Sequence, residues 1–179
     1  MRQLICFFAV AALLAAGSVQ AQWTWTPQTG RFVNLKRMPK ETAELQLEYA
    51  RSLMLSGDYR KALRESEKFS EYYGTDELAD DNQFLRGEIL KAQGNYMEAS
   101  SAFQQLIAAY PDSDRYDASV ENQYDIGDRY YQRGEQLAGK KWRLFRNRPY
   151  KRAADVYSMV VDNQPFSPAA AEAQYKIGL

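Results

Sequence analysis

From about residue 42 to the end of the chain, apolar and small side chains recur every three or four residues. That spacing places them on one face of an α-helix. The pattern is clearest in the stretch 80–111, where a first helical segment ends at Gly94, a residue suited to the left-handed conformation that follows many helices. A second segment starts near Tyr96 and ends before Pro111, which cannot continue a helix. The stretch therefore predicts two helices joined by a tight turn.

The same arrangement occurs three times along the chain. Segments 57–69 (GDYRKALRESEKF), 94–106 (GNYMEASSAFQQL) and 148–160 (RPYKRAADVYSMV) each place an Ala three residues after a Tyr. Each follows a helical segment with a small residue at a fixed position, where we expect two helices to cross: Ala50, Gly87 and Gly127. Self-similarity of this kind is typical of repeat proteins. The predicted units are 42–76, 80–113 and 120–165, with a partial fourth at 168–179.

These positions resemble those of the tetratricopeptide repeat, whose pattern ends in Ala, Phe and Pro. The first unit departs from that pattern at Ser66, where a large apolar residue is usual. The matching residues are Ala50, Leu53, Gly57, Tyr59 and Ala62 in the first unit, Gly87, Leu90, Gly94, Tyr96, Ala99, Phe103 and Pro111 in the second, and Gly127, Tyr130, Gly134, Tyr150, Ala153, Tyr157 and Pro165 in the third. The resemblance implies an all-α array of helical hairpins, a right-handed α-solenoid, that binds proteins and has no catalytic role.

Two longer segments resemble a smaller group of repeat proteins. AAYPDSDRYDASVENQYDIG (108–127) and DNQPFSPAAAEAQYKIG (162–178) each link a helix ending near a Pro to a helix ending in Tyr-x-Ile-Gly. They are similar to bacterial envelope repeat proteins, in particular to the BamD-like family of the machinery that assembles outer-membrane β-barrel proteins. That family usually carries a lipid-anchored Cys, whereas this chain has Gln22 at the corresponding place.

In a tetratricopeptide array the first helix of each unit lines the concave face. Counted from the small crossing residues, the side chains expected on this face are Leu47, Arg51, Met54, Phe84, Glu88, Lys91, Tyr124, Asp128 and Tyr131. They would form an aromatic and apolar floor edged by charges of both signs, which suits an extended or helical peptide. The alternative is that several of them pack against neighbouring helices.

The third unit is longer than the second. Gly87 and Tyr96 are 9 residues apart, whereas Gly127 and Tyr150 are 23 apart, so we expect a 14-residue insertion between its helices. The insertion holds cations and aromatic residues that are candidates for contact with a partner or a membrane: Lys140, Lys141, Trp142, Arg143, Phe145 and Arg146. They either bind acidic protein or anionic lipid, or form an extended hairpin whose aromatic residues pack on the array.

Residues 1–21 predict a signal peptide, because Arg2 precedes the thirteen apolar residues Leu4–Ala16 and small residues follow at 19–21. The apolar run is too short to span a membrane. We therefore expect an exported chain that starts at Gln22 and resides in the periplasm or at the periplasmic face of the outer membrane. Residues 22–41 are expected to form an irregular arm that docks on the first repeat, binds a partner or is disordered.

The residue types of the mature chain provide few groups for catalysis. The only cysteine is Cys6 and there is no His, which excludes disulfides, thiolate and imidazole chemistry and Cys/His zinc sites from the mature chain. Without Arg2 the mature chain carries 22 cations against 23 anions, which does not favour nucleic acid as a partner. The acidic stretches 76–81 and 112–117 suit helix N-termini and lack the pattern of a calcium loop. We expect no enzyme, cofactor or metal.

The sequence thus predicts a non-catalytic scaffold of the bacterial cell envelope that is BamD-like and aids assembly of outer-membrane β-barrel proteins. Its expected partners are envelope or assembly proteins or peptide segments, with peripheral membrane contact left open. The alternative is a periplasmic coordinator of cell-wall synthesis or division resembling the repeat protein of the Tol-Pal system. Such proteins usually add an N-terminal coiled coil, and no heptad run precedes Thr42. A half repeat at the end would expose its apolar face, so we also expect a longer protein.

Overall fold

The computed structural model describes residues 23–26, 31–34, 38–138 and 147–178. The chain divides into two compact units, Met1–Met38 and Pro39–Leu179. The predicted signal peptide and the cationic segment 139–146 lie outside the described residues. In the described ranges, no helix combines the length and the apolar character needed to cross a membrane.

The first unit contains a β-hairpin. Strands β1 (Trp23–Thr26) and β2 (Arg31–Asn34) pair antiparallel, with Trp23 opposite Asn34 and Thr26 opposite Arg31. The prediction of a wholly irregular arm at 22–41 was therefore wrong. Aromatic and β-branched residues in WTWT and RFVN favour strands, but four residues give too short an alternation to identify a strand from the sequence. Docking of this arm on the first repeat stays a prediction.

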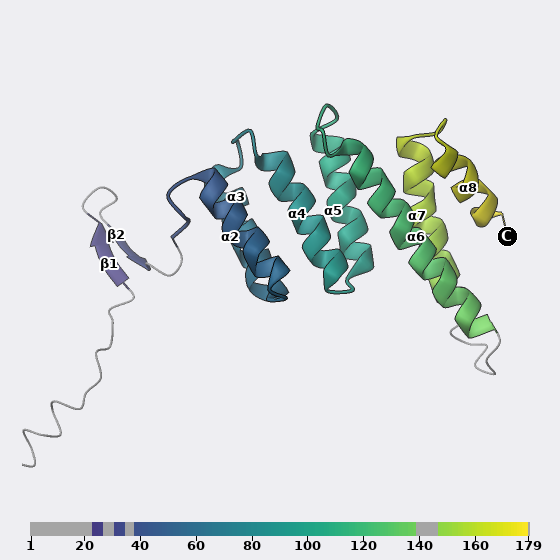
Figure 1. Cartoon of the computed structure of the whole chain (residues 1–179), viewed down its shortest axis with the longest axis horizontal. Coiled ribbons are helices and arrows are strands. Elements are labelled where there is room, and N and C mark those ends of the chain that lie inside the picture. Colours follow the sequence, from purple (N-terminus) through teal and green to yellow (C-terminus); the bar gives the residue numbers. More distant parts are fainter. Residues whose placement is uncertain (1–22, 27–30, 35–37, 139–146, 179) are drawn as a thin grey trace, which may run out of the picture. The chain divides into compact units, whose positions relative to one another are not determined.

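The described part of the second unit holds seven helices (Figure 1). They are α2 (Ala43–Leu55), α3 (Tyr59–Tyr73), α4 (Ala79–Ala92), α5 (Tyr96–Ala109), α6 (Tyr116–Ala138), α7 (Asn147–Asn163) and α8 (Pro168–Ile177). Helices α2 and α3, α4 and α5, and α6 and α7 pair as hairpins, and α8 packs on α7. This unit is therefore an all-α array of helical hairpins, as predicted.

Local signals explain where these helices begin and end. Thr42 and Ser167 accept hydrogen bonds from backbone N–H groups three residues later, at 3.3 and 3.1 Å, and so satisfy donors that the first turn leaves free. Gly57 and Gly94 both adopt a φ of 81°, the left-handed region, in the turns after α2 and α4. The helix-ending role predicted for Gly94 is confirmed.

In the second and third repeats, the two helices cross where a glycine faces an aromatic ring. A methyl group on Gly87 would lie 2.5 Å from ring carbon Cε1 of Phe103, and one on Gly127 would lie 2.6 Å from Cε1 of Tyr157. Both rings are buried. Because a Cβ does not approach a ring atom this closely, only glycine fits at either position. The close crossing predicted at Gly87 and the fully buried Ala99 is confirmed.

The first repeat has neither the glycine nor the ring at this place. Ala50 stands at the glycine position and Ser66 at the ring position, and both are fully buried. Helix α4 reaches over this space, and the side-chain amide of Asn82 donates a hydrogen bond to the backbone oxygen of Ser66 at 3.2 Å. The departure seen at Ser66 in the sequence is therefore accommodated by contact with the next repeat.

The third repeat is long because its helices are long. Helix α6 ends 11 residues after Gly127, whereas α4 ends 5 residues after Gly87. Helix α7 begins 10 residues before Tyr157, whereas α5 begins 7 before Phe103. Nine of the fourteen extra residues therefore lie within helices, so the prediction of an insertion wholly between the helices was wrong.

Gly134 does not end a helix, contrary to its match with Gly94. It lies inside α6 and is buried, and a methyl group there would come within 2.7 Å of the Tyr150 ring. Gly134 follows Gly127 by seven residues, about two helical turns, and Tyr150 precedes Tyr157 by the same interval. The extension therefore repeats the glycine–tyrosine contact further along the same pair of helices.

Candidate functional site

Three of the nine side chains predicted for the concave face serve helix packing. Leu47 is 5% exposed and belongs to the core between the first and second repeats, so its placement on the face was wrong. Phe84 packs on the ring of Phe103 with centroids 5.6 Å apart. Tyr131 meets Tyr150 edge-on at 5.7 Å. For these residues the packing alternative is the one that the structure supports.

Two further members, Tyr124 and Asp128, bind the following helices of the same array. Asp128 accepts a hydrogen bond from the Tyr157 hydroxyl and another from Nζ of Lys176 at 2.7 Å. Lys176 also donates to the Tyr124 hydroxyl at 2.9 Å. Burial and the Asp128 carboxylate raise the pKa of Tyr157, which keeps its hydroxyl a donor. These concave positions of the third repeat therefore fasten α7 and α8 to α6.

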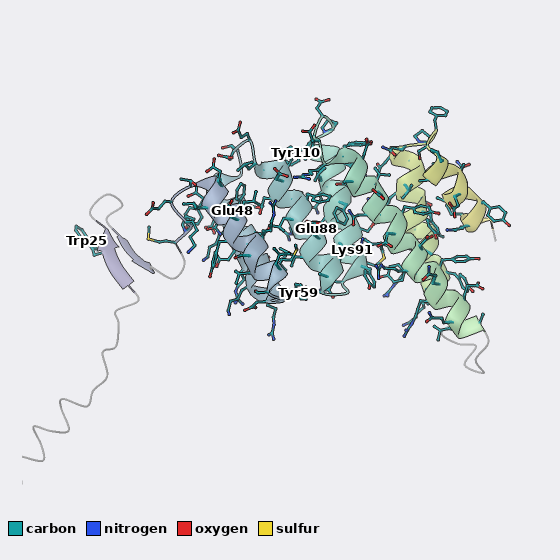
Figure 2. The ribbon with its side chains drawn as sticks, viewed as in Figure 1. Trp25, Glu48, Tyr59, Glu88, Lys91 and Tyr110 are labelled. Carbon is teal, nitrogen blue, oxygen red and sulfur yellow. The ribbon has the colours of Figure 1, made fainter. Side chains whose placement is uncertain are left out.

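Glu88 and Lys91 of the second repeat, together with Met54 of the first, occupy open positions. Met54, Glu88 and Lys91 line a hollow of about 580 Å³, here named the peptide hollow, to which α2, α3, α4, α5 and α6 all contribute. Figure 2 shows Glu88 and Lys91 along α4 and Tyr59 at the start of α3. The other lining residues are Leu55, Tyr59, Ala92, Tyr96, Asn122 and Arg129. Leu55 is 78% exposed.

Several of these lining residues were not predicted. Tyr59 and Tyr96 were interpreted only as packing residues, yet both are partly exposed and line the hollow. Leu55 lies five residues after Ala50 and Arg129 two residues after Gly127, whereas the count placed residues of the face one and four positions after each crossing residue, so it passed over both. The sequence did hold one usable signal for this hollow: Leu55 is an apolar residue two positions before the helix-ending Gly57.

A row of paired charges crosses the hollow from α4 to α6. Nζ of Lys91 lies 2.6 Å from Asp125 and 2.7 Å from the side-chain oxygen of Asn122. Asp125 also accepts a hydrogen bond from Arg129 at 3.0 Å. Lys91 is thus held by its neighbours and presents an ordered polar edge.

Glu88 has no such partner. Within the described residues it forms no ion pair, although it is partly buried in the array. Burial raises the pKa of Glu88, and the nearby cations Arg51, Arg115 and Lys91 act against that shift. A partly dehydrated carboxylate surrounded by cations that do not touch it is a polar group still able to accept a hydrogen bond from a ligand.

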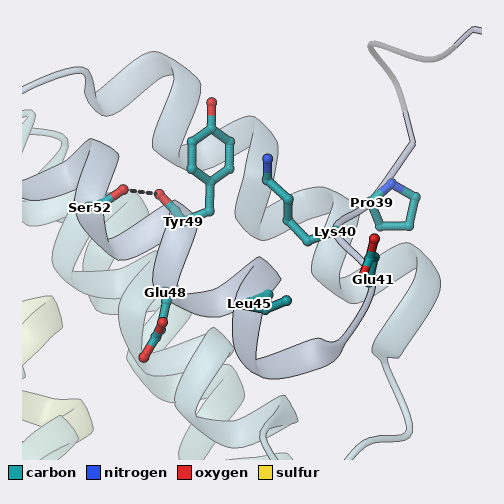
Figure 3. Close-up of a pocket in the computed structure, with 7 residues that line it drawn as sticks. All are labelled: Pro39, Lys40, Glu41, Leu45, Glu48, Tyr49 and Ser52. Carbon is teal, nitrogen blue, oxygen red and sulfur yellow. Dashed lines mark hydrogen bonds between the residues drawn. The ribbon is translucent and has the colours of Figure 1, made fainter.

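Another hollow is lined by α2 and the residues just before it (Figure 3). Nζ of Lys40 sits 4.2 Å from the centroid of the Tyr49 ring, and Leu45 is 48% exposed. The Ser52 hydroxyl donates to the backbone oxygen of Tyr49 at 2.8 Å.

The acidic stretch 76–81 has structural contacts. Asp76 accepts a hydrogen bond from the backbone N–H of Leu78 at 3.0 Å, as expected near a helix start. Asp81 lies 2.6 Å from Nε of Arg115, so this ion pair connects α4 to the loop before α6. No group of three or more His, Cys, Asp and Glu residues suited to a metal ion occurs in the described ranges.

All six predicted insertion contacts, Lys140, Lys141, Trp142, Arg143, Phe145 and Arg146, lie outside those ranges.

One comparison with known proteins bears on this arrangement. Residues 81–113, which contain α5 and all but the first two residues of α4, match the family profile described as Tetratricopeptide repeat. No match was found among curated proteins. Helices α2 with α3 and α6 with α7 repeat the pairing of the matched segment, so the array has the tetratricopeptide-repeat fold, and tetratricopeptide repeats are protein-interaction modules.

Proposed function

We propose that this protein is a non-catalytic scaffold that holds an extended polypeptide segment in the peptide hollow. The observation that carries the proposal is the exposure of Leu55 at 78% beside partly exposed Met54, in a concave site edged by Lys91 and Glu88. Apolar anchors in a hollow provide affinity for a peptide, and the charged edge fixes its register.

We further propose that the scaffold acts in the bacterial cell envelope, in a BamD-like role during assembly of outer-membrane β-barrel proteins. The signal-like residues 1–21 and the Tyr-x-Ile-Gly helix ends support this role. Strands of β-barrels alternate apolar and polar side chains. An unfolded strand laid along the hollow can therefore direct apolar side chains to Met54 and Leu55 and polar ones to Lys91 and Glu88.

The test replaces an anchor without disturbing the fold. Leu55→Ser removes an exposed apolar side chain at the hollow, and Phe166→Ser does the same at a residue that is 99% exposed and does not line it. The parent and both variants are used to capture proteins from a bacterial envelope extract, with circular dichroism to verify helix content. We expect Leu55→Ser to lose β-barrel precursors or their assembly proteins and Phe166→Ser to retain them.

Two outcomes would count against the proposal. Equal capture by Leu55→Ser and the parent would mean that the hollow is not the binding site. Capture of cell-wall synthesis or division proteins in place of β-barrel components would favour the Tol-Pal-like alternative. Export is checked separately by N-terminal sequencing of the periplasmic fraction, where we expect the chain to start at Gln22.

A further inference from the structure

A second hollow, of about 370 Å³, lies between the starts of α5 and α7 and the middle of α6. It is here named the arginine–tyrosine hollow. Apart from Pro149, its lining consists of arginines and tyrosines: Arg129, Arg133, Arg148, Arg152, Tyr96 and Tyr130. Among the described residues that line it, none carries a carboxylate. So dense a set of cations is unexpected in a chain whose total charge is balanced.

The tyrosine rings hold two of the guanidinium groups. Arg129 lies over Tyr96 and Arg152 over Tyr130, each with its guanidinium carbon 5.6 Å from the ring centroid. The two rings also meet edge-on, at 5.9 Å between centroids. A guanidinium that stacks by its face keeps the N–H donors at its edge available for a ligand.

Much of the positive charge here is not neutralised by the protein. Arg129 is paired with Asp125, which also binds Lys91. Within the described ranges neither Arg133 nor Arg152 forms an ion pair, and both are exposed. Helices α5 and α7 both begin at the hollow, so their positive ends add to the field.

We propose that the arginine–tyrosine hollow binds carboxylate side chains of an acidic segment in the partner protein. The edge of a guanidinium matches a carboxylate in two parallel hydrogen bonds, and the volume suits one or two side chains. The two hollows share Tyr96 and Arg129, so one polypeptide can pass from the apolar anchors into the cationic hollow. This inference rests on the proposed function in taking the ligand to be a polypeptide. A concave site of this size fits a side chain better than it fits a bilayer surface.

The test uses synthetic probes and does not require the natural partner. A fluorescein-labelled peptide of five Glu-Gly pairs is compared with a matched peptide of five Gln-Gly pairs by fluorescence anisotropy at low salt. We expect the parent protein to prefer the Glu peptide, with the preference weakening as salt rises. Arg133→Gln combined with Arg152→Gln should weaken Glu-peptide binding by about tenfold, as expected for loss of two charge-assisted contacts.

The matched control is Arg60→Gln combined with Arg64→Gln, which removes two exposed cations from α3, outside the hollow. This control should bind the Glu peptide within about twofold of the parent, since surface charges away from a site contribute little. Circular dichroism of all variants should coincide. An equal loss in both double variants would overturn the proposal, because it would show only a general charge effect.

Further outcomes separate this inference from the proposed function. If the parent fails to distinguish the Glu peptide from the Gln peptide while Leu55→Ser still loses captured proteins, the acidic preference is wrong and the scaffold function stands. If vesicles containing anionic phosphatidylglycerol bind the parent through Arg133 and Arg152 and the Glu peptide does not bind, the site recognises lipid and the proposal fails. Loss of peptide binding on changing Lys140, Lys141, Arg143 and Arg146 to Gln, with no effect at Arg133 and Arg152, would also overturn it.

Discussion

The second and third repeats use the same glycine–ring contact, but their rings differ by one hydroxyl group. In the second repeat Phe103 is fully buried and packs on Phe84. In the third repeat the hydroxyl of Tyr157 donates to Asp128. Asp128 follows its crossing glycine directly, and Glu88 follows Gly87 in the same way, so the two carboxylates are equivalent in the repeat.

This difference decides what each carboxylate does. Asp128 is used within the array, because Tyr157 and Lys176 both bind it. Phe103 has no hydroxyl group, and in the part of the chain that the structure describes Glu88 remains without an ion pair at the edge of the peptide hollow. Equivalent positions of a repeat can therefore be structural in one unit and available for a ligand in another, depending on which side chains of the following helices reach the carboxylate.

The largest loss of stability is expected from replacing the glycine at the helix crossing of the second repeat. Gly87→Ala places a methyl group 2.5 Å from the Phe103 ring, which is fully buried and cannot move aside. Overpacking costs about 1–3 kcal/mol, and the close contact puts this variant at the upper end. Ala gains about 1 kcal/mol over Gly in a helix, so a net loss of about 2 kcal/mol is expected in urea denaturation.

Gly134→Ala is the matched variant for that measurement. Its methyl group would meet Tyr150, which is only partly buried and can turn toward solvent. The stability of Gly134→Ala should therefore stay close to that of the parent. Equal losses in the two variants would mean that the extension of the third repeat is packed as rigidly as the crossing of the second.

The next largest effect concerns the attachment of α8. Lys176 bonds Asp128, Tyr124 and Glu172 at 2.7–2.9 Å, and Lys176→Met retains an apolar stem but loses every one of these bonds. Charge-assisted hydrogen bonds contribute about 1.5–3 kcal/mol, and partial exposure here reduces that to about 1–2 kcal/mol. We expect faster hydrogen exchange in α8 than in the parent. Unchanged exchange in α8 would show that Ala170 and Ala173 hold the helix without Lys176.

A smaller effect is expected from removing the hydroxyl that distinguishes the repeats. Tyr157→Phe deletes the hydrogen bond to Asp128 and keeps the ring over Gly127, so about 1 kcal/mol of unfolding free energy should be lost. The reverse variant, Phe103→Tyr, brings a hydroxyl toward Glu88 and should weaken peptide binding. A Tyr157→Phe protein as stable as the parent would show that Lys176 alone satisfies Asp128.

The sequence predicted the helical pairs well because their signals are local. Gly94, Pro111 and the spacing of apolar residues depend only on the chain nearby, and the predicted units agree with the helix bounds to within a few residues. The extra length of the third repeat was placed wrongly because Gly134 has the same identity as a helix-ending glycine. Its interior role depends on Tyr150, which lies on the next helix.

The candidate site was less predictable for the same reason. Whether Asp128 or Glu88 faces a ligand depends on the residue opposite it and, for Asp128, on Lys176 48 residues away. Counting positions along one helix therefore cannot identify which carboxylate is available to a ligand. The positions Met54, Glu88 and Lys91 were found from spacing, whereas the arginine–tyrosine hollow combines residues from three helices.

The smallest and most specific effect concerns the pH dependence of stability at Glu88. Burial raises its pKa above the ordinary value of 4.5, so the folded state holds the proton more tightly than the unfolded state. Its ionisation therefore lowers stability as the pH rises above 4.5. Glu88→Gln removes this loss, so the variant should match the parent near pH 4 and be slightly more stable at pH 7.

Denaturant midpoints at pH 4 and pH 7 measure this difference, with exposed Glu71→Gln as the control that should not change it. Asp128→Asn provides the contrast, because it gives up hydrogen bonds from Tyr157 and Lys176 and should lower stability at pH 7. If Glu88→Gln also lowers stability at pH 7, then Glu88 supports the fold as Asp128 does. In that case the carboxylate is not held ready for a ligand, and the contrast between the two repeats is lost.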